Sequence, residues 1–179
     1  MSSVLGTYAR KNISFTKGEG CYLFTENGDK YLDFVQGIAV NVLGHCHDHL
    51  VKKVKEQSEK LWHVSNAFII PEQERLAKRL TENTFADFVC FQNSGTEATE
   101  ASIKITRKYF HSIGKPEKNR IITFKGAFHG RTLASLFAAN NPTHTKGFGP
   151  KVDGFDQVPF ADHDALKKII NKNTAAIMI

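Results

Sequence analysis

The sequence predicts an α/β protein built on a largely parallel β-sheet. In the second half of the chain, short apolar segments alternate with amphipathic segments of helical period, which is the pattern of parallel strands joined by helices. Apolar residues make up 41% and charged residues 23% of the 179 residues, as in ordinary globular domains. No apolar run reaches the roughly 18 residues that a membrane-spanning helix needs. The composition therefore excludes a disordered tail, a collagen-like repeat and a disulfide-rich miniprotein.

The first third of the chain predicts paired strands, then a loop and a helix. Residues 13–35 hold short β-type segments separated by glycines, and Asn27-Gly28 is a strong hairpin signal. Residues 37–49 predict a loop-rich crossing. A helix over about 49–61 follows, because its apolar residues recur on one helical face. Asp48 stands where it could cap this helix.

Two further helices are predicted by their order of charges. Pro71 is a typical first residue of a helix, and acidic residues follow it before basic ones, which suits the helix dipole. Residues 95–110 show the same order, and Ser94 and Glu97 have the spacing of a capping box. The face expected to be shared on this helix consists of Ala98, Ala101, Ile105 and Tyr109.

Three buried strands complete the predicted sheet. The first covers about 86–92 and includes Cys90, which we expect to pack as a small hydrophobic residue. The second covers 120–125, and a helix over 162–171 connects to the third at 175–179. Because the chain ends inside an apolar strand with no following helix or cap, we expect it to be part of a longer protein.

Charge and cysteine content favour a cytoplasmic protein that does not bind nucleic acid. Lys and Arg number 24 against 18 Asp and Glu, and the basic residues are scattered rather than gathered in a patch. Cys21, Cys46 and Cys90 form no CxxC pair, which fits free thiols in a reducing compartment. The first twelve residues lack the apolar core of a secretory signal. A nucleic-acid-binding module remains an alternative, which a salt-dependent DNA-binding assay would test.

The segment from His45 to His49 raises the question of a metal site. On a strand, His45, His47 and His49 would share one face, whereas a helix would disperse them. No complementary ligand cluster stands out elsewhere in the sequence. We therefore favour a polar loop that enters a helix over a zinc site.

Two short motifs could carry chemistry. In Phe91-Gln-Asn-Ser-Gly-Thr-Glu97, a strand leads into a tight turn and a helix start, where free backbone amides could bind a phosphate. Gly95 would allow close approach and Thr96 would add a hydroxyl donor. The simpler interpretation of this first motif is an ordinary capped helix start, which needs no ligand.

The second motif is Lys125-Gly-Ala-Phe-His-Gly-Arg-Thr132, which follows a strand at the sheet edge where α/β proteins bind ligands. Phe128 could stack on a planar ring, and Arg131 could grip a carboxylate with two hydrogen bonds. The simpler interpretation is a glycine-rich turn with a packed phenylalanine and a surface arginine.

The motifs DFVQGIAVNVLGH, SNAFIIPEQERLAKRL, FQNSGTEATEASIKITRKY, ITFKGAFHGRTLASL and GFGPKVDGFDQVPF occur in one order. Together they resemble the amino-terminal half of a class III pyridoxal-phosphate-dependent aminotransferase, over nearly the whole chain. The resemblance implies a type I aminotransferase fold, with a small-domain segment at 1–49 and a truncated cofactor domain at 50–179. It also implies a chain about twice as long that works as a homodimer.

The resemblance implies a role for each matching residue. Gly95 and Thr96 resemble the pair that holds the phosphate of pyridoxal 5'-phosphate, Phe128 the aromatic ring that stacks on the cofactor, and Arg131 the arginine that binds the substrate α-carboxylate. The reaction implied is transfer of an amino group from N2-acetylornithine to 2-oxoglutarate, a step of arginine biosynthesis.

The resemblance also implies that essential groups lie beyond Ile179. In the family these are the lysine that binds the cofactor covalently, the aspartate that pairs with its ring nitrogen, and a phosphate-binding threonine of the partner subunit. Lys104 and Lys125 are not at the matching place and should be exposed surface residues. These 179 residues alone should therefore not catalyse transamination.

Alternatives remain open at the level of the substrate. Another class III enzyme would use ornithine, succinylornithine, succinyl-diaminopimelate or 4-aminobutyrate as amino donor. A natural end at Ile179 would instead leave a non-catalytic remnant that binds a phosphate or a dimer partner.

Overall fold

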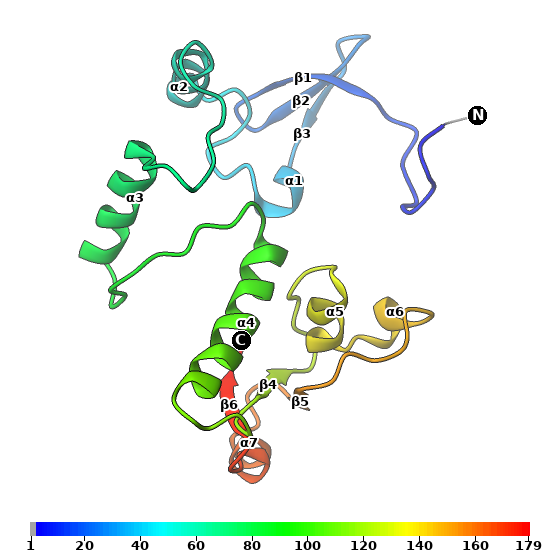
Figure 1. The fold of residues 1–179 in the computed structure, drawn as a ribbon. Helices are drawn as coiled ribbons and strands as arrows, with labels where there is room; N and C mark the ends of the chain where they lie inside the picture. The colour runs from blue at the N-terminus through cyan, green and yellow to red at the C-terminus, as the bar shows by residue number, and fades with distance from the viewer. Residues whose placement is uncertain (1–2) are drawn as a thin grey trace. The chain divides into compact units, whose positions relative to one another are not determined.

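The computed structural model describes residues 3–179 and separates the chain into two compact units (Figure 1). The first unit extends to Leu76 and the second covers Ala77–Ile179, so the division falls inside helix α3 (Pro71–Glu82). The start of α3 at Pro71 confirms the prediction for this helix. The domain boundary expected between residues 49 and 50 remains a prediction.

The first unit begins with a three-stranded antiparallel sheet. Its strands β1 (Phe15–Glu19), β2 (Tyr22–Thr25) and β3 (Lys30–Leu32) pair in chain order, which confirms the paired strands expected over 13–35. Gly28 adopts φ +88° in the turn between β2 and β3, and its amide donates to the Thr25 carbonyl at 3.1 Å. Glycine adopts this left-handed conformation without steric cost, which explains the hairpin signal.

The loop expected over 37–49 contains a short left-handed turn, α1 (Gln36–Ala39). Its four residues all have positive φ, including 64° at the β-branched Ile38, a conformation that such residues rarely adopt. Asp33 holds the start of this turn, because one of its carboxylate oxygens accepts from the amides of Val35 and Gln36 at 2.9 Å. The Gln36 amide and the imidazole of His45 lower the pKa of Asp33 below its ordinary value.

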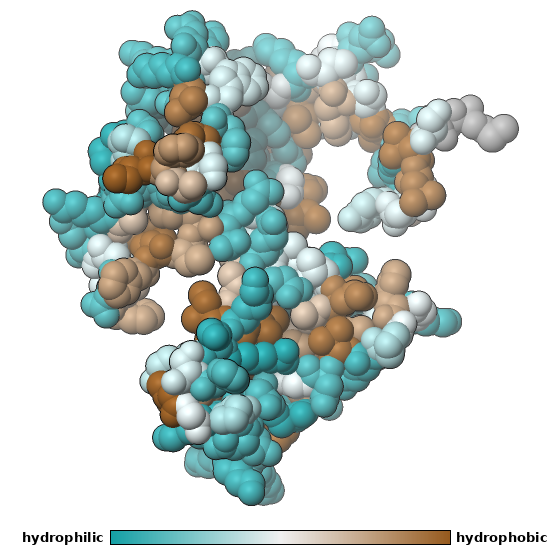
Figure 2. Space-filling view, viewed as in Figure 1, coloured by the Kyte–Doolittle hydropathy of each residue, from teal (hydrophilic) through white to brown (hydrophobic). Residues whose placement is uncertain are grey.

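Helix α2 (Asp48–Ser58) follows, close to the predicted range. The prediction that Asp48 caps it is wrong, because His47 is the N-cap residue and makes no side-chain capping bond. Asp48 is instead the first helical residue, where its negative charge interacts favourably with the positive end of the helix dipole. No residue between Ser3 and Leu76 is buried, and Figure 2 shows hydrophobic side chains at the surface of the molecule.

The second unit is a parallel sheet, as predicted, and helices pack on both of its faces. The strands β4 (Arg120–Phe124), β5 (Phe155–Val158) and β6 (Thr174–Ile177) lie in the order β5-β4-β6. The first and third match the segments predicted at 120–125 and 175–179, although β6 is half-buried rather than buried. The sequence analysis did not predict β5. The helices of this unit are α4 (Gly95–Ser112), α5 (Leu133–Ala139), α6 (Pro142–Thr145) and α7 (His163–Ile169).

Alternation along β4 builds two cores. Ile121 packs with residues of α4 and α5 on one face, whereas Ile122 and Phe124 pack against α7 on the other. Both isoleucines are at most 1% exposed, as expected of a central strand covered on both sides. Neither core contains a residue of the first unit.

The predictions of a strand over 86–92 and of a buried Cys90 are wrong. Residues 86–92 form no strand, and Cys90 is exposed, because no described strand lies beside this segment to share hydrogen bonds with it. On α4 the buried residue is Ile103, whereas Ile105 and Tyr109 are 56% and 57% exposed. Periodicity identified the helix, but the position of the sheet selects the face that is buried.

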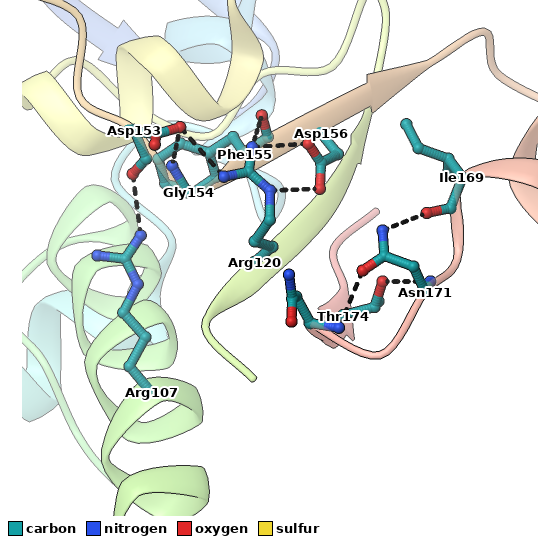
Figure 3. Close-up of polar contacts among 10 residues, drawn as sticks. Arg107, Arg120, Asp153, Gly154, Phe155, Asp156, Ile169, Asn171 and Thr174 are labelled. Atoms are coloured by element: carbon teal, nitrogen blue, oxygen red, sulfur yellow. Dashed lines mark hydrogen bonds and ion pairs between the residues drawn. The ribbon is translucent and has the colours of Figure 1, made fainter. Parts of the chain in front are cut away.

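An arginine network joins α4 to the amino ends of β4 and β5 (Figure 3). Arg120 at the start of β4 donates from Nε and Nη2 to the two carboxylate oxygens of Asp156, at 2.8 and 2.7 Å. Its Nη1 reaches Asp153 at 3.3 Å, and Arg107 of α4 donates to the Asp153 carbonyl at 3.1 Å. The fork onto Asp156 is the strong, bidentate form of this interaction and fixes the register of β4 and β5. This edge is opposite the carboxyl ends of the strands.

Candidate functional site

A pocket lies at the carboxyl edge of the parallel sheet. The start of α4 and the loop after β4, some thirty residues apart in sequence, enclose a cavity volume of about 410 Å³. All four residues predicted for the site line it, so the two motifs form one pocket. The lining residues are Gly95, Thr96, Thr99, Phe128, His129, Gly130 and Arg131.

The first turn of α4 offers free hydrogen-bond donors to this pocket. Ser94 caps the helix, because its hydroxyl oxygen accepts from the Glu97 amide at 3.3 Å, which confirms the capping prediction at this position. Among residues 3–179, no acceptor pairs with the amides of Gly95 and Thr96. Unpaired amides at the positive end of an 18-residue helix favour an anion such as a phosphate group.

Gly130 brings the loop after β4 into direct contact with Thr96. A Cβ built on Gly130 would lie 2.5 Å from the Cβ of Thr96 and closer still to its hydroxyl oxygen, and Gly130 has φ +121°. No other residue type fits this contact without displacing Thr96. The glycine therefore sets how closely the loop approaches the phosphate-binding turn.

A cluster of three hydroxyl groups and one carboxylate lies behind Thr96. The hydroxyl oxygen of Thr96 is 3.3 Å from that of Thr132 and 3.2 Å from that of Ser135. Thr132 donates to the Glu100 carboxylate at 2.5 Å, and its oxygen is 2.9 Å from Ser135. Sequence reasoning missed Glu100, Thr132 and Ser135. The available signal was the four-residue spacing of Thr96 and Glu100, which places both on one face of α4.

Phe128 and Arg131 form the opposite side of the pocket. The ring of Phe128 is 67% exposed, so it is not the packed core residue of the simpler interpretation. The guanidinium carbon of Arg131 lies 5.5 Å from the centre of this ring, within the range of a cation–π contact. The arginine side chain is exposed and has no carboxylate partner among residues 3–179. A planar ligand and a carboxylate could therefore each find a partner here.

His129 is the one ionisable group buried in the pocket wall among the described residues. It is 8% exposed, and its Nε2 atom is buried without a hydrogen-bond partner in this part of the chain. Burial lowers the pKa of His129 below its ordinary value, so the imidazole is neutral near pH 7. Sequence reasoning assigned no role to this histidine beyond its place in the Lys125–Thr132 motif. Its position between Phe128 and Gly130 was the only signal.

The two lysines considered for a catalytic role are exposed, as expected. Lys104 lies on the exposed side of α4, and Lys125 follows the end of β4. Lys125 lines a neighbouring hollow of about 360 Å³ together with Phe124, Phe160 and His129. Neither lysine lines the pocket that contains Thr96 and Arg131.

The histidine-rich segment belongs to the first unit. His45 pairs through Nε2 with Asp33 at 2.8 Å, and Asn41 approaches its Nδ1 atom at 2.9 Å. Within residues 3–179, no group of three or more His, Cys, Asp or Glu side chains could hold a metal ion. The three cysteines in this range are free and exposed. The described helices also include none that is long and apolar enough to cross a membrane.

Comparison with known proteins identifies the family. The model of the class III aminotransferases matches residues 7–179. The chain belongs to this family. The expected type I aminotransferase architecture, in truncated form, agrees with the parallel sheet and with solved transaminase structures that the chain resembles.

The similar proteins are longer than this class III aminotransferase chain. Acetylornithine aminotransferase of Agrobacterium fabrum is 61% identical over 173 residues, which are 97% of this chain and 43% of that protein. The enzyme of the same name from Brucella melitensis is 56% identical with the same coverage. The chain thus spans less than half the length of the curated relatives that it matches.

The ornithine aminotransferase of Toxoplasma gondii shares the fold of this class III chain. Its crystal structure superposes with a TM-score of 0.92 at 28% identity, over 98% of this chain and 42% of that one. A second structure of that enzyme, crystallised with oxidised glutathione, has a TM-score of 0.91 and holds pyridoxal phosphate at partial occupancy in its active site.

Proposed function

We propose that these residues are the amino-terminal part of a pyridoxal-phosphate-dependent aminotransferase that moves an amino group from N2-acetylornithine to 2-oxoglutarate. The observation that carries the proposal is the single pocket formed by Gly95, Thr96, Phe128 and Arg131. Identities of 56% and 61% to acetylornithine aminotransferases support this amino donor. We further propose that the complete enzyme is a cytoplasmic homodimer, with residues 1–49 in its small domain and 50–179 in its cofactor domain.

The pocket fits pyridoxal 5'-phosphate on three counts. The free amides of Gly95 and Thr96, with the Thr96 hydroxyl, would bind the phosphate group. The exposed ring of Phe128 would stack on the pyridine ring. Neutral His129 adds no positive charge beside the ring. When bound, the cofactor supplies an electron sink for the carbon atom that loses its proton.

Arg131 would orient the substrate in this enzyme. Its guanidinium group can donate two parallel hydrogen bonds to the α-carboxylate of an amino acid or a keto acid. The contact with Phe128 keeps the guanidinium group near the ring on which the cofactor would lie. The chain would thus hold the reacting carbon atom close to the cofactor, which is the positioning that catalysis requires. No described lysine lines this pocket, so the covalent anchor would come from the remaining length of the enzyme.

The test is a set of half-reactions with the full-length product of the gene. The purified protein should carry the absorbance of bound pyridoxal phosphate and lose it on addition of N2-acetylornithine, while ornithine and 4-aminobutyrate react more slowly. Equal rates with the three donors would overturn the specific assignment and leave a broader class III activity. Absence of cofactor absorbance in the full-length protein would overturn the proposal itself.

Phe128→Ala tests the cofactor arrangement within the same proposal. Loss of stacking should raise the dissociation constant of pyridoxal phosphate by about tenfold, since an aromatic pair and its buried area contribute on the order of 1–2 kcal/mol. Phe128→Tyr retains the ring and is the matched control. Unchanged cofactor affinity in Phe128→Ala would contradict the stacking role.

A further inference from the structure

The hydroxyl cluster behind Thr96 links the two halves of the pocket through a carboxylate. We propose that Glu100 is a positioning residue. By accepting a hydrogen bond from the Thr132 hydroxyl, it fixes the loop that carries Phe128 and Arg131 against the phosphate-binding turn of α4. This inference rests on the proposed function, because it assigns a role towards the same cofactor and substrate.

The hydroxyl group of Thr132 makes an unusual hydrogen bond. This residue is the N-cap of α5, where a threonine hydroxyl ordinarily accepts from an amide of its own helix. Here it makes no capping bond and donates instead to Glu100 on α4. A bond to an ionised acceptor is stronger than a neutral one. The local capping bond is therefore replaced by a bond between two elements.

Thr132 lies next to the residue that would bind the substrate. Thr132 directly follows Arg131, so the hydrogen bond that holds Thr132 also determines the position of the Arg131 backbone, from which the arginine side chain extends. Glu100 lies one helical turn after Thr96 on the same face of α4. The bond between Glu100 and Thr132 therefore ties the arginine to the helix that would hold the phosphate.

Ser135 connects the two threonines of the cluster. Ser135 is fully buried at 0% exposure and contacts the hydroxyl groups of both Thr96 and Thr132. The Thr132 hydroxyl has one proton, for which Glu100 and Ser135 compete, and the ionised carboxylate at 2.5 Å is the stronger acceptor. The Thr96 hydroxyl donates to Ser135 at 3.2 Å, and a phosphate bound in the pocket would compete for that proton. Ser135 therefore connects the threonine that Glu100 holds to the threonine that would face the phosphate.

The charge of Glu100 would act on the phosphate site as well. A carboxylate close to an anion site repels the anion, so its charge alone would weaken phosphate binding. The hydrogen bond that it accepts and the charge that it carries act in opposite directions. Glutamine retains an acceptor oxygen without the charge, whereas alanine removes both. Glu100→Gln and Glu100→Ala therefore separate the two effects by sign.

The experiment compares these variants in the full-length enzyme, at a temperature where all are folded. Glu100→Ala should weaken the binding of pyridoxal phosphate and raise the Michaelis constant for the keto-acid substrate by about tenfold each, as expected for loss of a hydrogen bond to a charged group. Glu100→Gln should bind pyridoxal phosphate as tightly as the wild type or more tightly. Thr132→Val should reproduce Glu100→Ala, and Thr132→Ser should restore binding.

A double variant and a control complete the design. Glu100→Ala combined with Thr132→Val should be no worse than either single change, because the two remove one interaction. Ser102→Ala is the matched control, since the Ser102 hydroxyl on the same helix bonds only to the Thr99 carbonyl at 2.7 Å. It should leave the affinity for pyridoxal phosphate unchanged.

Two outcomes would overturn the inference. One is a Glu100→Gln variant as defective as Glu100→Ala, and the other is additive loss in the double variant. If Glu100→Ala does not fold, Thr132→Val and Glu100→Gln still decide the question. A wild-type protein that binds no pyridoxal phosphate would contradict the proposed function instead. In that case, thermal unfolding of the wild type, Glu100→Ala, Thr132→Val and their double variant still tests the coupling between Glu100 and Thr132.

Discussion

Gly130 touches Thr96 so closely that a Cβ at position 130 would lie 2.5 Å from the threonine Cβ. The two residues come from the loop after β4 and from the first turn of α4, which carry the two halves of the pocket. Because the contact is made by backbone atoms of the loop, the width of the pocket depends on glycine at this position. Gly130 also has φ +121°, a conformation that other residues rarely adopt.

Gly130→Ala should therefore open the pocket and destabilise the second unit. We expect a loss of about 1–3 kcal/mol in the free energy of unfolding, from overpacking together with backbone strain. Gly147→Ala is the matched control, because Gly147 has φ +85° but no atom near a built Cβ. Chemical denaturation of both variants measures the difference. Equal losses would show that backbone strain alone, and not the contact with Thr96, makes glycine necessary.

Arg131→Ala should impair substrate use far more than cofactor binding. Removal of the two-pronged bond to a carboxylate should lower kcat/KM by on the order of a hundredfold, while the absorbance of bound pyridoxal phosphate persists. Arg131→Lys keeps the positive charge but loses the pair of parallel hydrogen bonds, so its kcat/KM should lie between those of the wild type and Arg131→Ala. Steady-state kinetics on the full-length enzyme provide the measurement. A parallel fall in cofactor retention would mean that Arg131 belongs to the cofactor site.

Thr123→Val should destabilise the sheet although it preserves shape. The fully buried Thr123 hydroxyl donates at 2.7 Å to the carbonyl of Ala138, near the end of α5, where helical carbonyls lack a partner within the helix. Leaving that carbonyl unpaired should cost about 1–3 kcal/mol. Thr81→Val is the control, since the Thr81 hydroxyl bonds to its own exposed helix, and it should change stability by less than about 0.5 kcal/mol. An equal effect in thermal unfolding would refute this account.

His129 should make stability depend on pH below neutrality. Its pKa is lowered in the folded protein by burial, so the unfolded chain binds a proton more readily than the folded one. The folded state should therefore keep its full stability above about pH 6.5, and lose it as the pH falls from there towards the lower folded pKa. His129→Gln should flatten this part of the profile in denaturation measured between pH 7 and pH 5. A profile unchanged by the substitution would show that the imidazole is not buried neutral.

Local patterns predicted much of the secondary structure and the two site motifs. Asn27-Gly28 predicted a hairpin because few residues accept the left-handed turn, and Ser94 predicted the start of α4 because its hydroxyl satisfies a free amide. Such effects act within a few residues. The prediction of a strand at 86–92 was wrong, because a strand also needs a neighbouring strand to share its backbone hydrogen bonds. A local sequence pattern does not reveal whether such a strand is present.

The sequence by itself determined the family, through the order of its motifs, and the residue types Gly95, Thr96, Phe128 and Arg131 as candidates for a site. Only the tertiary structure decided that these four line one pocket and that Glu100 accepts a hydrogen bond from Thr132 behind Thr96. It also decided that His129 is buried and that Ile103 faces the core. The physical reason is that contacts between segments thirty residues apart depend on how the sheet places its helices, and no local periodicity encodes that placement.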